Sequence, residues 1–271
     1  GNALGGLLPA ALRWLQPSWS WFAAYRGVLV LGALASAAAA LPLVALRGLT
    51  EPRAHRDAPP PSAHDNRRLA SIALNAALIG AGAGFVIPFM NLYFKNRFEC
   101  SSSQIGVFFG VAQVCTALAT LAAPALARRF GKLRTAVAAE LLSLPFLVTL
   151  GGEQLLPIAV GAFWLRATFM QASTPLLQAF VMEVLPPGLR ARSTSLNNMV
   201  WNLGWAASAT VSGVVLERYG DAVPFYLTAT LYLVAAVTFY AAFRGTPENP
   251  VGDVALSEEA KGRRGEGPAS D

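Results

Sequence analysis

The stretch AVPFYLTATLYLVAAVTFYAAF, residues 222–243, contains no Asp, Glu, Lys or Arg. A helix needs about 20 mostly apolar residues to cross a bilayer, and inside lipid it satisfies its own backbone hydrogen bonds. Four further stretches that lack these residues are long enough to span: 27–46, 69–94, 100–127 and 193–216. Two more candidate spans are 135–152, which contains Glu140, and 154–185, which contains Arg166 and Glu183. Residues 1–12 are apolar but short, and we interpret them as the end of a span that begins before Gly1. The sequence therefore predicts an all-α, polytopic transmembrane helix bundle.

The composition excludes several other classes of protein. Of the 271 residues, 54% are hydrophobic and only 13% are charged, whereas an average soluble domain has roughly 25% charged residues. A disordered chain, a soluble globular domain and a nucleic-acid-binding domain are thereby excluded, despite the net charge of +6. Two Cys and two His are too few for a disulfide framework or a structural zinc site. No catalytic arrangement of side chains is present, so we expect no enzyme activity and no cofactor.

Lys and Arg are unevenly distributed among the predicted connections, and this distribution sets the orientation of a membrane protein. Five of them lie on one side and one, Arg166, lies inside a span. The other side holds Arg47, Arg53, Arg56, Arg67, Arg68, Arg128, Arg129, Lys132, Arg134, Arg190, Arg192, Arg244, Lys261, Arg263 and Arg264. We therefore expect the 47–68 loop and the C-terminus to be cytoplasmic, in a plasma or inner membrane.

The chain is expected to divide into four parts. Residues 47–68 include Pro59, Pro60 and Pro61 and mixed charges, which is typical of a flexible linker. Residues 245–271 are rich in Gly, Pro and Glu and predict a disordered tail. Between them, residues 69–244 would form a six-helix bundle, and residues 1–46 would belong to a preceding bundle.

The six spans after the linker contain a faint internal repeat. Pro88 is followed by Pro175 at 87 positions, and Arg129-Phe130-Gly131 by Arg218-Tyr219-Gly220 at 89 positions. Three helices are an odd number, so the two copies must cross the membrane in opposite directions. This inverted repeat is typical of secondary transporters.

Three stretches carry a resemblance to a known family. Residues 127–134, ARRFGKLR, resemble the basic Gly-containing loop between the second and third helices of each half of a major facilitator superfamily transporter. Residues 181–192, VMEVLPPGLRAR, resemble the acidic-Pro-Arg stretch after the fourth helix of a half. Residues 193–213 resemble the helix that follows. The chain thus looks like the C-terminal half of such a transporter, with the last one and a half helices of the N-terminal half.

This resemblance implies secondary-active transport of a small solute by alternating access, with efflux as one form of it. The implied partners are the solute, a coupling proton or ion, the lipid bilayer and the remaining N-terminal half, and no nucleic acid. Residues 69–94, 100–127, 154–185 and 193–216 would line the cavity, while 135–152 and 222–243 would face lipid. A non-transporting membrane scaffold or receptor-like subunit is the alternative.

Arg166 is the most informative polar residue inside a span. A cation there is costly and is expected to face the bundle interior or a wet cavity. It either anchors an anionic solute group or makes a structural pair with an acid or helix carbonyls. The acidic partner would lie in the N-terminal half, because we expect no acid of this chain at the depth of Arg166.

Other polar residues form stripes that are candidates for lining the cavity. Gln171, Thr174 and Gln178 share one helix face, and Arg166 lies on a different face, together with Ser173. The remaining candidates are Gln113, Thr116, Asn198, Asn202, Asn75 and Asn91. The alternative for these side chains is hydrogen bonding between helices.

A cytoplasmic gate is predicted where an acid lies near a basic loop. Glu183 would pair with Arg128, Arg129 and Lys132, and Glu140 would join the same network. The alternative is a set of solvated surface charges that contribute little. Small residues that allow close helix packing are Gly80, Gly82, Gly84, Gly106, Gly110, Gly204, Ser208 and Ser212.

Overall fold

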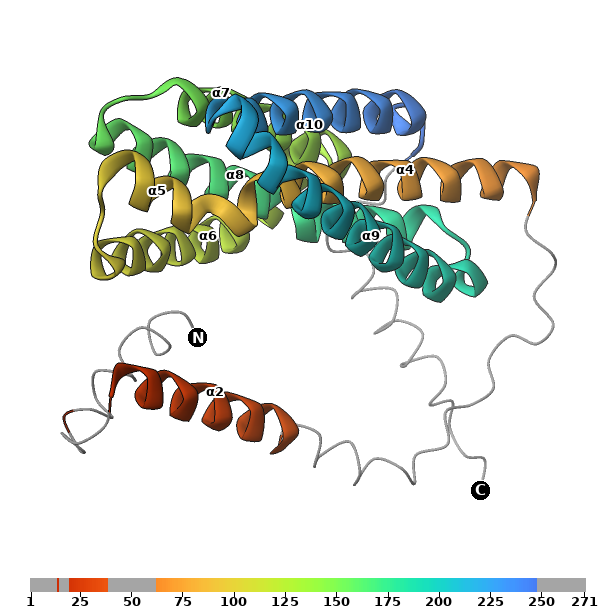
Figure 1. Ribbon diagram of the computed structural model, residues 1–271. Helices are drawn as coiled ribbons and strands as arrows, with labels where there is room; N and C mark the ends of the chain where they lie inside the picture. The colour runs from red at the N-terminus through yellow and green to blue at the C-terminus, as the bar shows by residue number, and fades with distance from the viewer. Residues whose placement is uncertain (1–13, 15–19, 39–61, 248–271) are drawn as a thin grey trace. The chain divides into compact units, whose positions relative to one another are not determined.

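The computed structural model describes residue 14 and residues 20–38 and 62–247 (Figure 1). The helices in these ranges are α2 (Trp21–Ala38), α4 (Ala63–Val86), the 3-10 turn η2 (Ile87–Phe89), α5 (Met90–Phe98), α6 (Ser102–Phe130), α7 (Lys132–Gly152), α8 (Leu156–Val184), α9 (Pro187–Tyr219) and α10 (Ala222–Phe243). No β-strand occurs in the described ranges. The predicted all-α fold is confirmed.

Among the described residues, five helical segments are long and apolar enough to cross a membrane. They are Ala63–Phe98, which joins α4, η2 and α5, and the helices α6, α7, α9 and α10. α8 has 29 residues, which is ample for a span, but Arg166, Gln171 and Gln178 lower its hydropathy. The prediction of a chain that crosses the membrane several times is confirmed.

The helix α4 begins earlier than the sequence analysis predicted. The Ser62 hydroxyl accepts the backbone N–H of Asp65 at 3.1 Å, and the Asp65 carboxylate accepts the backbone N–H of Ser62 at 3.1 Å. This reciprocal cap satisfies free N–H groups of the first turn, so residues 63–68, expected in the linker, are helical. The predicted partial span, the rest of the linker and most of the predicted tail (residues 1–12, 47–61 and 248–271) lie outside the described residues.

The chain divides into two compact units. The first contains α2, the end of α5 and the start of α6, with residues 1–59 and 94–111. In it the Cys100 backbone N–H donates to the Phe94 carbonyl at 3.3 Å, and the Phe94 ring lies 5.4 Å from that of Phe108. These contacts close the turn between α5 and α6. The second unit, residues 60–93 and 112–271, contains all the candidate site residues.

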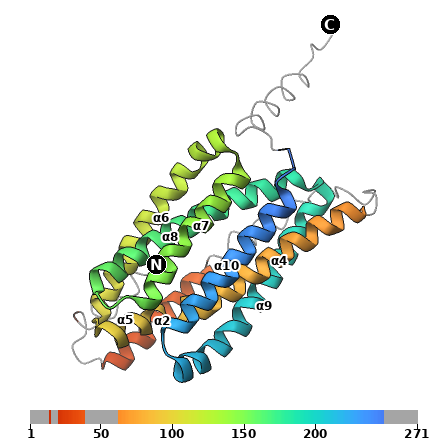
Figure 2. The same cartoon turned by 90° about the horizontal axis from the view of Figure 1, so that it is seen from above.

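Within the second unit, α10 is the central helix. It packs between α4 and α7, while α9 packs on α4 and α8 packs on α7 (Figure 2). The predicted repeat relates α4 to α8 and α7 to α10. If the repeat is real, the contact between α4 and α10 should have a counterpart between α8 and α7. The contact between α7 and α10 should be its own counterpart. The structure contains all three contacts. These three contacts agree with an inverted repeat.

Small residues bring α4 and α9 into close contact. A Cβ atom at Gly80 would collide with the Trp201 carbonyl, and one at Gly84 with the Trp205 carbonyl. Side chains larger than glycine would push the two helices apart, which confirms the predicted packing role of these positions. By contrast, a Cβ atom added at Gly106 or Gly110 would have no atom of the described residues within 4 Å.

The helices of this unit differ in how much of their surface is covered. In α7 and in α10, 44% of the spanning window is buried, against 11% in α6 and in α9. α10 does keep an exposed apolar face with Leu233 and Val237, as expected of a helix in contact with lipid. Its central position, however, was not expected from the sequence.

Candidate functional site

The helix α8 carries polar side chains on two different faces. Gln171, Thr174 and Gln178 are exposed, whereas Arg166 and Ser173 are only 6% and 1% exposed. α8 remains a continuous helix past Pro175, so the two faces run along one rigid element. The separation of faces predicted from helical spacing is confirmed.

Arg166 is held inside the bundle by α10. Its Nη2 donates to the Tyr232 hydroxyl at 3.3 Å, and its guanidinium carbon lies 6.0 Å from the centre of the Tyr232 ring. Tyr232 is only 1% exposed. A buried guanidinium needs such partners because its desolvation is costly. The structure thus provides a hydroxyl partner within this chain, and the acidic partner expected from the N-terminal half stays a prediction.

Glu140 lies in the same interior and not in the network predicted for it. Its side chain is 2% exposed and lies beside the Ser173 hydroxyl of α8. The Tyr232 side chain interacts electrostatically with both Arg166 and Glu140. The prediction that Glu140 joins Lys132 and Glu183 at the N-terminal end of α7 is therefore wrong. The face of α7 that carries Glu140 is turned toward α8 and α10.

Amide side chains are uncovered on α6 and α9. Gln113 is exposed on α6 beside the half-buried Thr116, and Asn198 and Asn202 are exposed on α9. The Asn202 amide donates to the Asn198 carbonyl of its own helix at 2.7 Å. In the described part of the second unit, these amides are therefore not covered by a neighbouring helix.

Pro88 interrupts the long first segment of the second unit. It cannot donate a backbone hydrogen bond, and α4 gives way to the turn η2 at this point. Near this break, the Phe85 carbonyl accepts the Ser212 hydroxyl of α9 at 2.7 Å. Asn91 is exposed just beyond the break, whereas Asn75 is half-buried in α4, with an Oδ1 that has no partner among the described residues.

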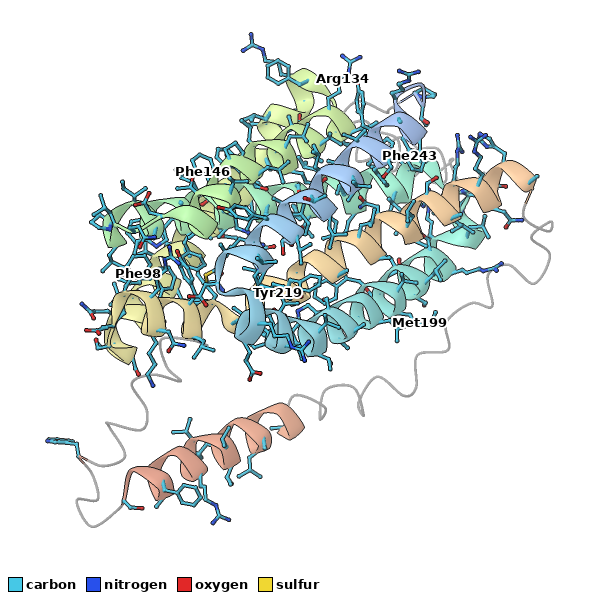
Figure 3. The ribbon with its side chains drawn as sticks, turned by 45° about the horizontal axis from the view of Figure 1, so that its top comes forward. Phe98, Arg134, Phe146, Met199, Tyr219 and Phe243 are labelled. Carbon is cyan, nitrogen blue, oxygen red and sulfur yellow. The ribbon has the colours of Figure 1, made fainter. Side chains whose placement is uncertain are left out.

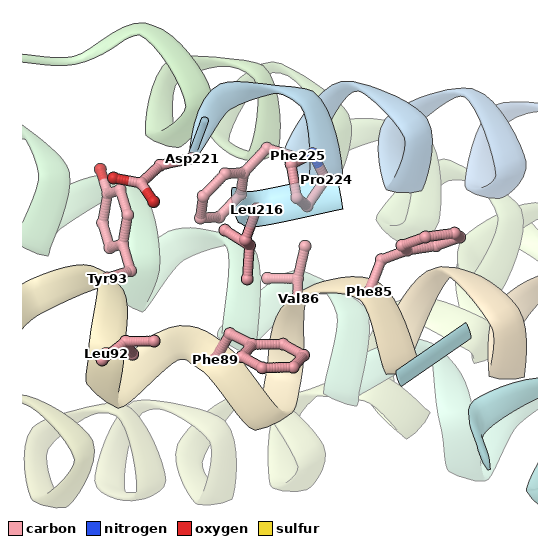
Figure 4. Close-up of a pocket in the computed structure, with 9 residues that line it drawn as sticks. All are labelled: Phe85, Val86, Phe89, Leu92, Tyr93, Leu216, Asp221, Pro224 and Phe225. Atoms are coloured by element: carbon pink, nitrogen blue, oxygen red, sulfur yellow. The ribbon is translucent and has the colours of Figure 1, made fainter. Parts of the chain in front are cut away.

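A small pocket opens beside this break (Figure 4). Figure 4 shows the Tyr93 ring next to the Asp221 carboxylate at one end of the lining. The other lining side chains are apolar: Phe85, Val86, Phe89, Leu92, Leu216, Pro224 and Phe225.

Three cations converge on the C-terminal end of α8. Lys132 of α7 pairs with Glu183. Arg68 of α4 donates to the Val184 carbonyl at 3.1 Å, and Arg190 of α9 donates to the Leu185 carbonyl at 3.2 Å. Helix C-termini attract cations because their last carbonyls are unsatisfied. The four helices α4, α7, α8 and α9 are thereby tied at one end.

Only one of the three predicted basic gate residues takes part in this cluster. Arg128 and Arg129 are exposed, and the Arg129 guanidinium lies 5.3 Å from the centre of the Phe130 ring. Arg134, exposed near the start of α7, is labelled in Figure 3. The predicted pairing of Glu183 is thus confirmed for Lys132, while Arg128 and Arg129 point elsewhere.

Three members of these clusters were not predicted from the sequence: Tyr232, Arg68 and Arg190. A tyrosine inside an otherwise apolar span was the available signal for Tyr232, since a buried phenol usually finds a hydrogen-bond partner. The two arginines were counted only as topology signals. Each of them meets a carbonyl of α8 from another helix, and local sequence does not reveal such a contact.

Comparison with known proteins identifies the family. The family model "Major Facilitator Superfamily" matches residues 72–267. The chain belongs to this superfamily. It is 24% identical over 165 residues to an uncharacterized MFS-type transporter of Methanocaldococcus jannaschii, covering 59% of this chain and 41% of that protein.

A second relative is the multidrug resistance protein MdtG of Proteus mirabilis, 25% identical over 192 residues, which covers 68% of this chain and 46% of that protein. The chain therefore spans less than half the length of these relatives. Among solved structures, the POT family transporter PepTSo matches with a TM-score of 0.60 at 17% identity, covering 72% of this chain and 42% of that one. The structural match supports the shared fold.

Proposed function

We propose that this chain is part of a secondary-active transporter that moves a small solute across the cell membrane by alternating access. Residues 69–244 would form its C-terminal six-helix bundle, residues 1–46 would belong to the N-terminal bundle, and the loop at 47–68 and the C-terminus would be cytoplasmic. Support comes from the family and from relatives of which the matched part covers only 41% and 46%. The N-terminal half would complete the solute pathway.

The observation that carries this proposal is the uncovered polar surface of the second unit. Gln171, Thr174 and Gln178 are exposed on α8, and further amides are exposed on α6 and α9. Amides in contact with hydrocarbon are costly, because nothing there replaces their hydrogen bonds to water. A water-filled cavity closed by the N-terminal half removes this cost and offers the amides to a solute.

Cysteine labelling tests whether this surface is wet. In a full-length protein with Cys100 and Cys115 replaced by Ser, Gln171→Cys and Gln178→Cys should react with a membrane-impermeant charged thiol reagent. Val237→Cys on the exposed apolar face of α10 is the matched control and should stay unlabelled. Equal protection of all three positions would place α8 against lipid or protein and contradict a cavity.

Transport itself requires a second measurement. MdtG is called a multidrug resistance protein, so export of organic compounds is the first activity to test. Cells that express the full-length protein should accumulate less of a panel of fluorescent compounds, and Gln171→Ala should reduce this effect while Val237→Ala should not. A labelled cavity without transport of any compound would favour the receptor-like alternative.

The charge cluster at the end of α8 would act in the same cycle as a clamp on this half. Lys132 and Glu183 both belong to the second unit, so their pairing ties α7 to α8. Arg128 and Arg129 are exposed beside it and are available to the N-terminal half. We expect their replacement by Gln to alter the preference between inward-open and outward-open states, measured by labelling from each side.

A further inference from the structure

The small pocket at the start of α10 combines aromatic rings with one carboxylate. Its lining includes the rings of Phe85, Phe89, Tyr93 and Phe225 and the carboxylate of Asp221 (Figure 4). All of its lining residues belong to the second unit, and none of them comes from α8, which carries the exposed amides. The pocket is therefore separate from the polar surface that the proposed function assigns to the solute.

The Asp221 carboxylate has no partner within the described part of the chain. It is half-buried, makes no capping hydrogen bond to α10, and forms no ion pair with any described residue. The neighbouring Tyr93 hydroxyl donates its proton to the Leu150 carbonyl at 2.7 Å. The Tyr93 ring packs edge-on against Phe225, with the ring centres 5.0 Å apart. A negative charge is thus held beside two fixed rings, and no cation of the described residues balances it.

This combination of groups favours an ammonium group that carries carbon substituents. Aromatic faces attract cations, and a carboxylate in the same pocket adds a charge-assisted hydrogen bond. An anion would be repelled by Asp221. An uncharged apolar group would cover the carboxylate without replacing its hydrogen bonds to water. Because the pocket is small, it fits one end of a ligand and leaves the remainder outside.

The pocket lies at the level where a bilayer changes from hydrocarbon to headgroups. The uncharged helix α10 begins directly after Asp221. Along α9, the charge cluster at Arg190 and the pocket at Leu216 are roughly 40 Å apart at 1.5 Å per residue. The hydrocarbon core is about 30 Å thick, so the pocket lies near the opposite membrane boundary from that cluster. Tyr219 and Tyr226 are exposed nearby in the chain, which is typical of such a boundary.

We propose that this pocket binds the ammonium group of a zwitterionic phospholipid, with Asp221 as its counter-ion. A second charge fits the same headgroup. Arg218 is exposed three positions before Asp221, at the end of α9, and forms no ion pair among the described residues. The Asp221 carboxylate accepts the ammonium N–H, and Arg218 is available to the phosphate. The exposed side chain of Leu92 offers apolar surface to the acyl chains at the rim.

Native mass spectrometry of the full-length protein, which counts bound lipids, tests this proposal. Phosphatidylethanolamine should bind more tightly than phosphatidylglycerol with the same acyl chains, because only the first carries an ammonium group. Asp221→Asn should weaken phosphatidylethanolamine binding by about tenfold or more, as for the loss of one charge-assisted hydrogen bond. Glu217→Gln, at an exposed acid of the same helix end, is the matched control and should bind like the wild type. Equal affinity of the wild type for both lipids, or undiminished binding by Asp221→Asn, would overturn the proposal.

Folding needs a separate control. Asn is as good as Asp at the start of a helix, so Asp221→Asn should unfold at the temperature of the wild type. Phe89→Leu provides a second variant if Asp221→Asn does not fold. It removes one half-buried ring from the pocket and should weaken phosphatidylethanolamine binding by about two- to fivefold, through the loss of one cation–π contact. Unchanged binding by Phe89→Leu would contradict an aromatic site.

A free organic cation is the competing occupant of the pocket. Ethylammonium chloride supplies the same ammonium group without phosphate or acyl chains, and it should displace phosphatidylethanolamine only at far higher concentrations. Arg218→Gln should weaken the lipid and leave ethylammonium binding unchanged. Displacement at concentrations equal to that of the lipid would identify a free alkylammonium ion as the occupant and overturn the lipid assignment. These measurements involve no transport, so their outcome is independent of the proposed function.

Discussion

The two faces of α8 have opposite environments although they belong to one continuous helix. Arg166 and Ser173 face α7 and α10 and are buried, whereas Gln171, Thr174 and Gln178 remain uncovered. The same contrast separates the tight α4–α9 contact from the open surfaces of α6 and α9. Polar side chains on the covered surface thus contact neighbouring helices of the bundle, whereas those on the uncovered surface are the ones that the proposed function assigns to the solute cavity.

The largest expected effect on stability is at the covered face of α8. Arg166→Ala should lower stability by about 2–5 kcal/mol, because it leaves a cavity and removes the partner of Tyr232 in the interior. Thermal unfolding in detergent measures this change. Arg134→Ala, at an exposed arginine of α7, is the control and should unfold like the wild type. Equal behaviour of the two variants would mean that burial does not distinguish the faces.

The next effect is expected at the end of α8. Glu183→Gln should cost about 1.5–3 kcal/mol, because it leaves the Lys132 cation, whose side chain is 7% exposed, without its carboxylate. Arg129→Gln changes an exposed charge of the same loop and should cost far less. Unfolding at low and high salt provides the measurement, since a largely buried pair is screened less than an exposed one. Equal losses in both variants would contradict the clamp.

Helix contacts provide a comparison that involves no charge. Gly84→Val should destabilise the protein by about 1–3 kcal/mol or more, because its side chain would overlap the Trp205 carbonyl. Gly213→Val on α9 has open space around the added Cβ and should be tolerated. Unfolding temperatures of the two variants measure the difference. A tolerated Gly84→Val would show that α4 and α9 do not approach closely in the membrane.

The smallest effect on stability is expected at the uncovered face. Gln171→Ala should change stability by no more than about 0.5 kcal/mol, as for exposed sites without partners, yet it should reduce transport. Parallel unfolding and transport measurements separate the two effects. A Gln171→Ala variant that unfolds easily would show that this amide makes a hydrogen bond to another helix. That result would favour the alternative, in which these polar side chains hold helices together.

Much of the fold could be predicted from local composition. The uncharged stretch at 222–243 coincides with α10, because membrane insertion depends on the apolar content of about 20 consecutive residues. Helix ends were predicted less well where a charged residue was taken to mark the end of a span. Arg67 and Arg68 were assigned to a linker, although Ser62 and Asp65 form a recognisable cap three residues apart.

For the candidate site, the sequence predicted which side chains share a helix face. It did not predict which residues of other helices they contact. Helical periodicity separated Gln171 from Arg166 correctly, because 100° per residue is a local property of the helix. It could not show that Arg166 meets Tyr232, which lies 66 positions away. Nor could it show which of three neighbouring cations pairs with Glu183, because the rotation of α7 against α8 makes that choice.

By itself, the sequence determined that this protein is helical, that it crosses a membrane several times, and which side chains share a helix face. These properties depend on short-range composition and on the fixed geometry of the helix. Only the tertiary structure decided which face is covered, that Glu140 belongs with Arg166 and Tyr232, and that α10 is the central helix. Those outcomes depend on how helices rotate and pack against one another, and contacts between residues far apart in sequence set that rotation.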